Sequence, residues 1–229
     1  MKKRLLVIDV GGTHVKLMIS RKKRRKFKSG PKMTPREMVR QMKSELKGWK
    51  FDAVVVGFPA PVRAGKILSD PKHLGKGWAG FNFEKALGKP VRILNDAALQ
   101  ALGSYRGGRM LFLGLGTGLG STLLLPDMVL PLELGDLPYR NHRIIEAFLG
   151  KSGIDDLGAK EWEREVHFAV DQLKKSVIAD YIVLGGGKAK KLKKLPADTE
   201  LGHNRNVFRG GVRIWQNDPR TGRPKWKVF

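Results

Sequence analysis

Near its start the chain contains the stretch Leu5-Leu6-Val7-Ile8-Asp9-Val10-Gly11-Gly12-Thr13-His14-Val15-Lys16. The first six of these residues are apolar apart from Asp9, which is typical of a buried β-strand. The two glycines and Thr13 form a turn signal, and a second apolar run extends from Val15 to Ile19. The stretch therefore predicts a hairpin with a carboxylate directly before its turn, followed by a third strand near Phe27.

The same pattern returns about 100 residues later along the chain. The second turn is Gly114-Leu115-Gly116-Thr117-Gly118-Leu119-Gly120-Ser121, between the apolar runs at 110–113 and 121–125. This repetition predicts two similar lobes that face one another across a central cleft, with a ligand between them. We divide the chain into a small first lobe (1–95), a larger second lobe (96–215) and a polar, extended tail (216–229).

The remaining patterns alternate between strands and helices, which predicts an α/β fold. Thr34, Pro35 and Glu37 have the spacing of a helix start, with Thr34 as the N-cap and Glu37 closing a capping box. Residues 126–156 are rich in loop-forming residues, with a short helix expected at 143–149. Further strands are expected at 51–58, 90–94 and 181–184, and further helices at 83–87, 96–105 and 159–178.

Both glycine turns suit the binding of phosphate groups. A phosphate needs backbone N–H donors at close range, and glycine leaves those donors uncovered by a side chain. The second turn matches neither the dinucleotide-binding fingerprint nor the GxxxxGK[ST] loop. Each turn taken alone is equally compatible with an ordinary tight hairpin.

Asp9 and Lys16 flank the first turn with opposite charges. Phosphoryl transfer needs a divalent cation near the transferring phosphate and a positive charge to neutralise the charge that develops. Asp9 suits the first role, because an unpaired carboxylate in a buried strand is costly. Lys16 suits the second role. The structural alternatives are a turn-capping aspartate and a solvent-facing strand lysine.

Asn95 and Asp96 lie between a predicted strand and a predicted helix. Ligand sites in α/β sheets gather at the carboxyl ends of strands. At such a place Asp96 can accept the proton of a substrate hydroxyl, with Asn95 fixing its orientation. Helix capping by Asn or Asp is an equally common alternative, and the sequence leaves both readings open.

The composition excludes several classes of protein and favours polyanionic partners. The 229 residues include 45 Lys or Arg against 21 Asp or Glu, for a net charge of +24, and no Cys. A disulfide framework and a thiolate metal site are therefore excluded. No run is long and apolar enough for a membrane span, and a cytoplasmic location is the default expectation. The basic run at 21–28 attracts nucleic acid, anionic lipid or polyphosphate, unless it is only a solvated hairpin tip.

Together these motifs resemble the ROK family of sugar kinases within the actin-like ATPase superfamily, and most closely its polyphosphate-dependent glucokinase branch. The resemblance covers most of residues 4–212 in the family's order and spacing. The stretches that carry it are Leu6 to Lys16, Gly57-Phe58-Pro59-Ala60-Pro61-Val62, Lys76-Gly77-Trp78, Leu94-Asn95-Asp96-Ala97, Gly114 to Ser121 and Leu184-Gly185-Gly186-Gly187. The resemblance implies an actin-like, ribonuclease H-like fold.

The resemblance also implies roles for individual residues. Asp96 is then the general base, and Asp9 holds Mg²⁺. Polar side chains at four positions contact the sugar: Asn95, Glu133, Asp136 and His73. The glycine turns and their neighbours hold the phosphates of the donor: Gly11, Gly12, Thr13, Lys16, Gly116, Thr117, Gly118 and Gly186.

The chain departs from the family at several positions. Asp136 stands where the family has a His, and His73 falls roughly where the family has a sugar-binding Asn, which puts the exact sugar in doubt. The Cys-rich zinc segment of many members is missing, as it is in the polyphosphate branch. Glu133 has the alternative of pairing with a neighbouring arginine, Arg140 or Arg143.

The expected activity is transfer of a phosphoryl group from polyphosphate, ATP or both to a hexose, with glucose as the leading candidate. The first alternative is an ATP-dependent kinase of another hexose or of an N-acetylated sugar. The second is a catalytically inactive relative that senses sugar or binds polyanions. The family's repressors carry an N-terminal helix-turn-helix, and the first strand is expected to leave no room for one. We therefore expect no specific nucleic acid and no membrane as partners. A homodimer is compatible with the resemblance.

Overall fold

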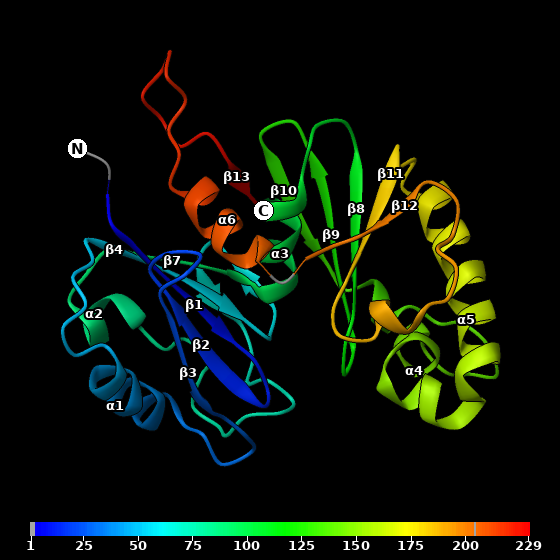
Figure 1. Cartoon of the computed structure of the whole chain (residues 1–229), viewed down its shortest axis with the longest axis horizontal. Helices are drawn as coiled ribbons and strands as arrows, with labels where there is room; N and C mark the ends of the chain where they lie inside the picture. The colour runs from blue at the N-terminus through cyan, green and yellow to red at the C-terminus, as the bar shows by residue number, and fades with distance from the viewer. Residues whose placement is uncertain (1–2, 204) are drawn as a thin grey trace.

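The computed structural model describes residues 3–203 and 205–229, which form two mixed β-sheets flanked by helices (Figure 1). The first sheet has the strand order β3-β2-β1-β4-β7, and the second repeats that order as β10-β9-β8-β11-β12. The first sheet contains β1 (Leu5–Val10), β2 (His14–Met18), β3 (Arg24–Lys28), β4 (Ala53–Phe58) and β7 (Val91–Asn95). The second contains β8 (Met110–Leu115), β9 (Leu119–Leu125), β10 (Met128–Leu132), β11 (Tyr181–Gly185) and β12 (Thr199–Leu201), and a sixth strand, β13 (Lys227–Val228), extends it beyond β10.

The helices sort into three layers around the two sheets (Figure 1). The outer face of the first sheet carries α1 (Pro35–Glu45) and α2 (Phe83–Leu87), and the outer face of the second carries α4 (Ile145–Leu149) and α5 (Lys151–Ser176). Between the sheets lie α3 (Asp96–Ser104) and α6 (Asn206–Ile214). A short hairpin, β5 (Val62–Arg63) and β6 (Lys66–Ile67), follows β4.

The alternation of side chains along β1 explains how one strand serves two cores. Leu6 and Ile8 belong to the outer core with α1, whereas Val7 packs in the central core with α3 and α6. Successive side chains of a strand point to opposite faces of the sheet. Asp9 therefore lies on the same face as Val7, toward the middle of the molecule.

The two central helices approach each other through glycines. A Cβ atom at Gly103 would overlap the backbone carbonyl of Asn206, and one at Gly210 would overlap the carbonyl of Leu99. At Gly211 a Cβ would overlap the side chain of Val7 in β1. The backbones of α3 and α6 are thus in direct contact, and α6 lies directly on the first sheet.

The structure differs from the sequence prediction in residues 126–156. This segment contains the strand β10 as well as the start of α5. Pro131 within β10 argues against a strand, yet its partner is Thr122 in β9, and the strand pairs with β9 and β13 (Lys227–Val228). The helix predicted from residue 159 begins earlier, because Gly158, with a φ of 74°, joins two helical segments across a kink.

Three smaller expectations also changed. Thr34 accepts a hydrogen bond from the Glu37 N–H, but the Glu37 carboxylate accepts from Arg40 and Gln41, so the reciprocal half of the capping box does not form. Five of the eight residues of the basic run, Arg24–Lys28, form β3. In residues 216–229, Trp226 packs against Tyr105, with ring centroids 5.6 Å apart. No helix in the described parts of the chain is long and apolar enough to cross a membrane.

Candidate active site

The first glycine turn leaves two backbone donors open. Gly11 donates its N–H to the carbonyl of His14 (3.0 Å), and Ser29 donates to the carbonyl of Thr13 (2.9 Å). Within the described residues, the N–H groups of Gly12 and Thr13 have no protein acceptor. His73 packs on this turn, since a Cβ at Gly12 would lie 2.9 Å from the His73 Cβ. The structure thus places His73 beside the first phosphate loop.

The second glycine turn follows β8 and is held from two sides. Gly116 donates to the carbonyl of Gly118 (3.0 Å), which tightens the turn. From the end of β11, Gly186 packs on Leu115 so closely that a Cβ would overlap the Leu115 carbonyl, and its φ of 80° also favours glycine. Gly186 and the second turn are therefore in direct contact, and their role in donor binding stays a prediction.

Asp9 and Lys16 form an ion pair across the first hairpin. They are register partners in β1 and β2, and the Lys16 ammonium lies 2.8 Å from the Asp9 carboxylate. Asp9 is nearly buried, whereas half of the Lys16 side chain is exposed. Lys16 is therefore not an unpaired, solvent-facing lysine. Its ammonium neutralises the Asp9 carboxylate, the one buried carboxylate of β1.

Asn95 and Asp96 divide the two roles that the sequence left open. Asn95 caps α3, because its Oδ1 accepts from the N–H groups of Ala97 (2.9 Å) and Ala98 (3.3 Å). Its Nδ2 donates weakly to the carbonyl of Ala60 (3.4 Å). Asp96 stands at the first position of the helix and accepts one hydrogen bond, from the Ala97 N–H (2.8 Å). The second carboxylate oxygen of Asp96 is therefore available to a substrate.

Two glycines allow the start of α3 to lie between the sheets. A Cβ at Gly57 in β4 would lie 3.5 Å from the Asp96 Cα and 2.9 Å from a Leu99 methyl. A Cβ at Gly120 in β9 would lie 2.7 Å from the Cβ of Ala97. Larger residues at either position would push the helix start away from the sheet. The location of Asp96 is thus fixed from both lobes.

The surroundings of Asp96 raise its pKa to about 7, mainly because burial disfavours the charged carboxylate. The nearby charge of Asp9 adds to the effect, and that of Glu133 contributes less. Asp9 comes from the first sheet and Glu133 from the segment after β10 in the second. A carboxyl group with a pKa near neutrality is suited to exchange a proton with a substrate hydroxyl.

Further carboxylates line the second-lobe side of the site. Partial desolvation raises the pKa of Glu133, and the charges of Asp136 and Glu146 raise it further while Lys72 opposes them. Glu133 directly precedes a short 3₁₀ turn at Leu134–Asp136, and Asp136 is its last residue. The arginine alternative for Glu133 is wrong. Arg140 pairs with Glu165 (3.2 Å) and Arg143 with Asp156 (3.0 Å).

Sequence reasoning missed Glu146 and Lys72. The Glu146 carboxylate accepts a hydrogen bond from the Leu119 N–H (3.1 Å), directly beside Gly118, and lies 3.4 Å from the Lys72 ammonium. The ion pair links α4 of the second lobe to the loop that carries His73. The only sequence signal for Glu146 is its place in the first turn of a short apolar helix, where an acidic residue is ordinary.

The residues present fit a magnesium ion bound mainly through its phosphate ligands. Mg²⁺ prefers oxygen ligands and is commonly held by one or two carboxylates together with water and substrate phosphates. Asp9 supplies such a carboxylate beside the first turn. The described residues contain no group of three or more metal-ligating side chains that would form a cage. Asp9 therefore suits the metal only together with a phosphate donor.

Removing the ionisable group at position 96 will stabilise the protein at neutral pH. The folded pKa of Asp96 is about 7 and the ordinary value is 3.8. Between these pH values the Asp96 carboxyl is ionised in the unfolded chain but still protonated in the folded protein. The free energy of unfolding of the wild type therefore falls as pH rises through this range. We expect Asp96→Asn to gain about 1–3 kcal/mol at pH 8, and much less at pH 4.5.

Urea unfolding of both proteins at these two pH values measures this difference. Comparing the variant with the wild type cancels the titration of all other groups. A variant that is less stable than the wild type at pH 8, or a difference that does not depend on pH, would contradict the burial of an ionisable carboxyl at this position.

Comparisons with known proteins bear on the family and the fold of the chain. A family model described as the ROK family matches residues 5–129. Among solved structures, the inorganic polyphosphate/ATP-glucomannokinase from Arthrobacter sp. strain KM superposes with a TM-score of 0.77 and 22% identity, over 91% of this chain and 96% of that chain. A ROK family glucokinase from Streptomyces griseus, in complex with glucose and AMPPNP, gives a TM-score of 0.73 and 14% identity, over 91% and 97%.

A ROK hexokinase from Thermus thermophilus gives a TM-score of 0.65 and 18% identity, over 91% of this chain and 96% of that chain. No curated protein sequence matches the chain significantly. The solved structures share its fold, so the predicted two-lobed α/β fold of the actin-like ATPase type is confirmed.

Proposed function

The chain belongs to the ROK family, and on that basis we propose that it is a sugar kinase whose preferred phosphoryl donor is inorganic polyphosphate. It transfers the terminal phosphoryl group to a hexose hydroxyl and converts glucose to glucose 6-phosphate. ATP is a second, weaker donor at the same glycine turns. Mg²⁺ near Asp9 shields the charge of the donor phosphates.

The residues of the site divide the reaction between them. The open N–H groups of Gly12 and Thr13 and the surface formed by Gly116, Gly118 and Gly186 hold the donor phosphates. The free oxygen of Asp96 takes the proton of the attacking sugar hydroxyl, whose oxygen then bonds to the terminal phosphorus in line with the bond that breaks. The donor leaves shortened by one phosphoryl group.

The second-lobe carboxylates suit the sugar. Hydroxyl groups donate hydrogen bonds well to carboxylates, and Glu133, Asp136 and Glu146 provide three of these acceptors on one side of Asp96. Asn95 keeps a spare amide hydrogen for a sugar oxygen. We assign these four residues to sugar binding. His73, which packs on the first turn, is better placed for the donor than for the sugar.

The observation that carries the choice of donor is a basic ladder on the first sheet, formed by Lys16, Arg24, Lys26 and Lys28. Lys16 is the register partner of both Asp9 and Lys26, so all three side chains share one face of the sheet. Lys28 and Arg24 lie two residues to either side of Lys26 in β3, so their side chains are on that same face. With strands about 4.8 Å apart, the ladder extends about 10 Å from Asp9 to the sheet edge.

The ladder suits a linear polyanion better than ATP. Lys26, Lys28 and Arg24 are exposed, and none of them pairs with a carboxylate in the part of the chain that the structure describes. The phosphates of ATP end near the glycine turns, where a nucleoside follows. A polyphosphate chain continues with one negative charge per phosphate, and each rung of the ladder can neutralise one.

Glucose phosphorylation with each donor tests the proposal directly. We expect glucose 6-phosphate to form with polyphosphate and Mg²⁺, and with ATP at a lower kcat/KM. Activity with ATP alone would contradict the choice of donor. The same assay with other hexoses and N-acetylated sugars tests the choice of acceptor. Salt-sensitive polyanion binding with no phosphorylation of any sugar would instead favour an inactive relative.

Charge reversal on the ladder will separate the two donors. We expect Lys26→Glu/Lys28→Glu to raise the KM for long-chain polyphosphate about tenfold, because two attractive contacts become repulsive, and to change the KM for ATP less than about twofold. Steady-state kinetics with both donors measures this. The matched control is Lys43→Glu/Lys47→Glu, with the same charge change at two exposed lysines in the last turn of α1 and just after it. Equal losses with both donors would contradict the ladder.

A further inference from the structure

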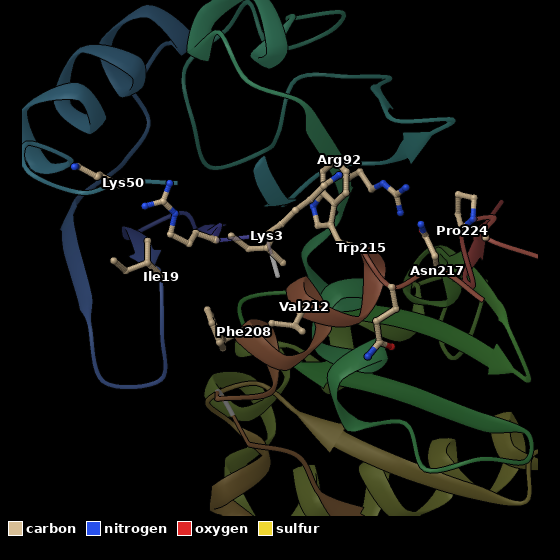
Figure 2. Close-up of a pocket in the computed structure, with 13 residues that line it drawn as sticks. Lys3, Ile19, Lys50, Arg92, Phe208, Val212, Trp215, Asn217 and Pro224 are labelled. Carbon is tan, nitrogen blue, oxygen red and sulfur yellow. The ribbon is translucent and has the colours of Figure 1, made fainter. Parts of the chain in front are cut away.

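A large cavity lies at the opposite end of the first sheet from the glycine turns. Its volume is about 990 Å³, and it lies where the chain enters β1, with α6 and the segment that follows α6 forming the other wall (Figure 2). Along β1 it is separated from Asp9 by about four residues, or about 13 Å. The cavity is therefore distinct from the catalytic cleft.

The walls of this cavity are basic. Lys3, Arg4, Lys50 and Arg92 line it, and no Asp or Glu is among its lining residues. Arg4 is neutralised by Asp52, with 2.9 Å between the guanidinium and the carboxylate. Lys3, Lys50 and Arg92 have no carboxylate partner among the described residues. The cavity thus concentrates three unneutralised positive charges.

Two of these cations meet at one aromatic ring. The Lys3 ammonium lies 4.9 Å from the centre of the Trp215 ring, and the Arg92 guanidinium lies 4.4 Å from it. Figure 2 shows both side chains reaching the indole. Each contact is favourable alone, but like charges held near one ring repel each other. An anion between them would remove that repulsion.

A purely structural role explains only part of this arrangement. Arg92 donates to the carbonyl of Ile214 and so caps the end of α6. Burial lowers its pKa, which shows that the partly buried charge has little compensation from the protein. Capping does not account for Lys3, whose ammonium lies over the same ring, or for Lys50, which adds a positive charge at the far end of the cavity.

The remaining lining is apolar with two amides. Phe208 and Val212 of α6 and the Trp215 ring supply apolar surface, and Gln216 and Asn217 supply amide donors and acceptors. In the view of Figure 2, Lys50 and Ile19 lie at one end of the cavity and Asn217 at the other, with Trp215 between them. Such a site accommodates a ligand with one charged end and one flat, apolar, hydrogen-bonding end.

We propose that this cavity is a second ligand site and binds a nucleotide, with its phosphate at Lys3 and Arg92 beside Trp215 and its base against Phe208 and Val212, while Lys50 adds positive charge at the far end. Gln216 and Asn217 then face the polar edge of the base. The site joins the first sheet to α6, which contacts α3 and hence the helix that carries Asp96. This inference does not depend on the proposed phosphoryl transfer, because its readout is local to Trp215.

Nuclear magnetic resonance of the ¹⁵N-labelled full chain tests the site. The chain has five tryptophans, and the Trp215 indole N–H, which is buried without an acceptor among the described residues, is assigned as the signal missing from Trp215→Phe. We expect AMP to shift this signal saturably. Adenosine and inorganic phosphate, which each lack one half of AMP, should bind at least about tenfold more weakly.

Variants of exposed lysines provide the control. We expect Lys3→Glu/Lys50→Glu to weaken AMP binding at the Trp215 signal about tenfold or more, and Lys43→Glu/Lys85→Glu, with the same charge change elsewhere on the first lobe, to leave it within about twofold. Three results would overturn the proposal: no shift of the Trp215 signal with AMP, equal affinity for phosphate and AMP, or unchanged affinity in Lys3→Glu/Lys50→Glu.

Discussion

Asp96→Asn will lower kcat for sugar phosphorylation about a thousandfold while changing the KM for the sugar less than about threefold. The amide keeps the hydrogen bond from the Ala97 N–H and the packing of the helix start, but it cannot accept a proton from the sugar hydroxyl. Loss of a general base typically costs between about 10²- and 10⁴-fold in rate. The loss should appear in kcat, because the interaction is realised only in the transition state.

The dependence of kcat/KM on pH provides a second test of the role of Asp96. Because the pKa of Asp96 is raised to about 7, kcat/KM of the wild type should rise with pH to a plateau, with a midpoint near pH 7. The residual activity of Asp96→Asn should lack that rise. Asp155→Asn is the matched control, since it removes an exposed carboxylate of α5 to which we assign no role in the site. An Asp96→Asn variant that retains more than a tenth of wild-type kcat would contradict the assignment.

The segment from Leu5 to Ile19 was sufficient to predict β1, β2 and the turn between them. The glycine turns, the strand that ends at Asn95 and the helix start at Asp96 were also predicted with small errors in their bounds. These features are local, since the period of apolar residues and the chemistry of glycine determine them. The repeated pattern also predicted the two-lobed architecture, because each copy supplies one sheet.

Contacts between distant segments could not be predicted in this way. Glu146 contacts the Leu119 N–H, 27 positions earlier in the chain, and Lys72, 74 positions earlier. No rule of sequence spacing predicts either contact. The sequence did not predict β10, because Pro131 is unfavourable within a strand. In the fold, pairing with β9 stabilises β10. The ladder of lysines likewise required the strand register, since the sequence gives only a basic run.

Gly210→Ala will destabilise the protein by about 3 kcal/mol, although alanine is the better helix former. A methyl group at this position would overlap the carbonyl of Leu99 and lie 3.1 Å from the Gly103 nitrogen. These atoms are backbone, so relief requires one whole helix to move rather than a side chain to rotate. Overpacking typically costs about 1–3 kcal/mol and occasionally more; a backbone overlap costing about 4 kcal/mol, offset by about 1 kcal/mol of helix propensity, leaves a loss of about 3 kcal/mol.

Urea or thermal unfolding measures the loss, which corresponds to a fall in Tm of about 6–12 °C for a chain of this size. Gly187→Ala is the matched control, because a Cβ there meets no atom within 4 Å, and it should stay within about 1 kcal/mol of the wild type. A Gly210→Ala protein as stable as the wild type would show that α3 and α6 are not in backbone contact.

The same substitution connects packing to catalysis. The start of α3 is held between Gly57 and Gly120, so a displacement of α3 by α6 cannot be absorbed there without moving Asp96 relative to the glycine turns. Misplacement of a catalytic group by about 1 Å can cost about 100-fold in rate. Gly210→Ala should therefore lower kcat about tenfold or more at 25 °C, well below its Tm, with the chemistry of every site residue unchanged. Full activity in a destabilised Gly210→Ala protein would mean that only α6 moves to relieve the overlap. The two sheets would then hold Asp96 in position without help from α6.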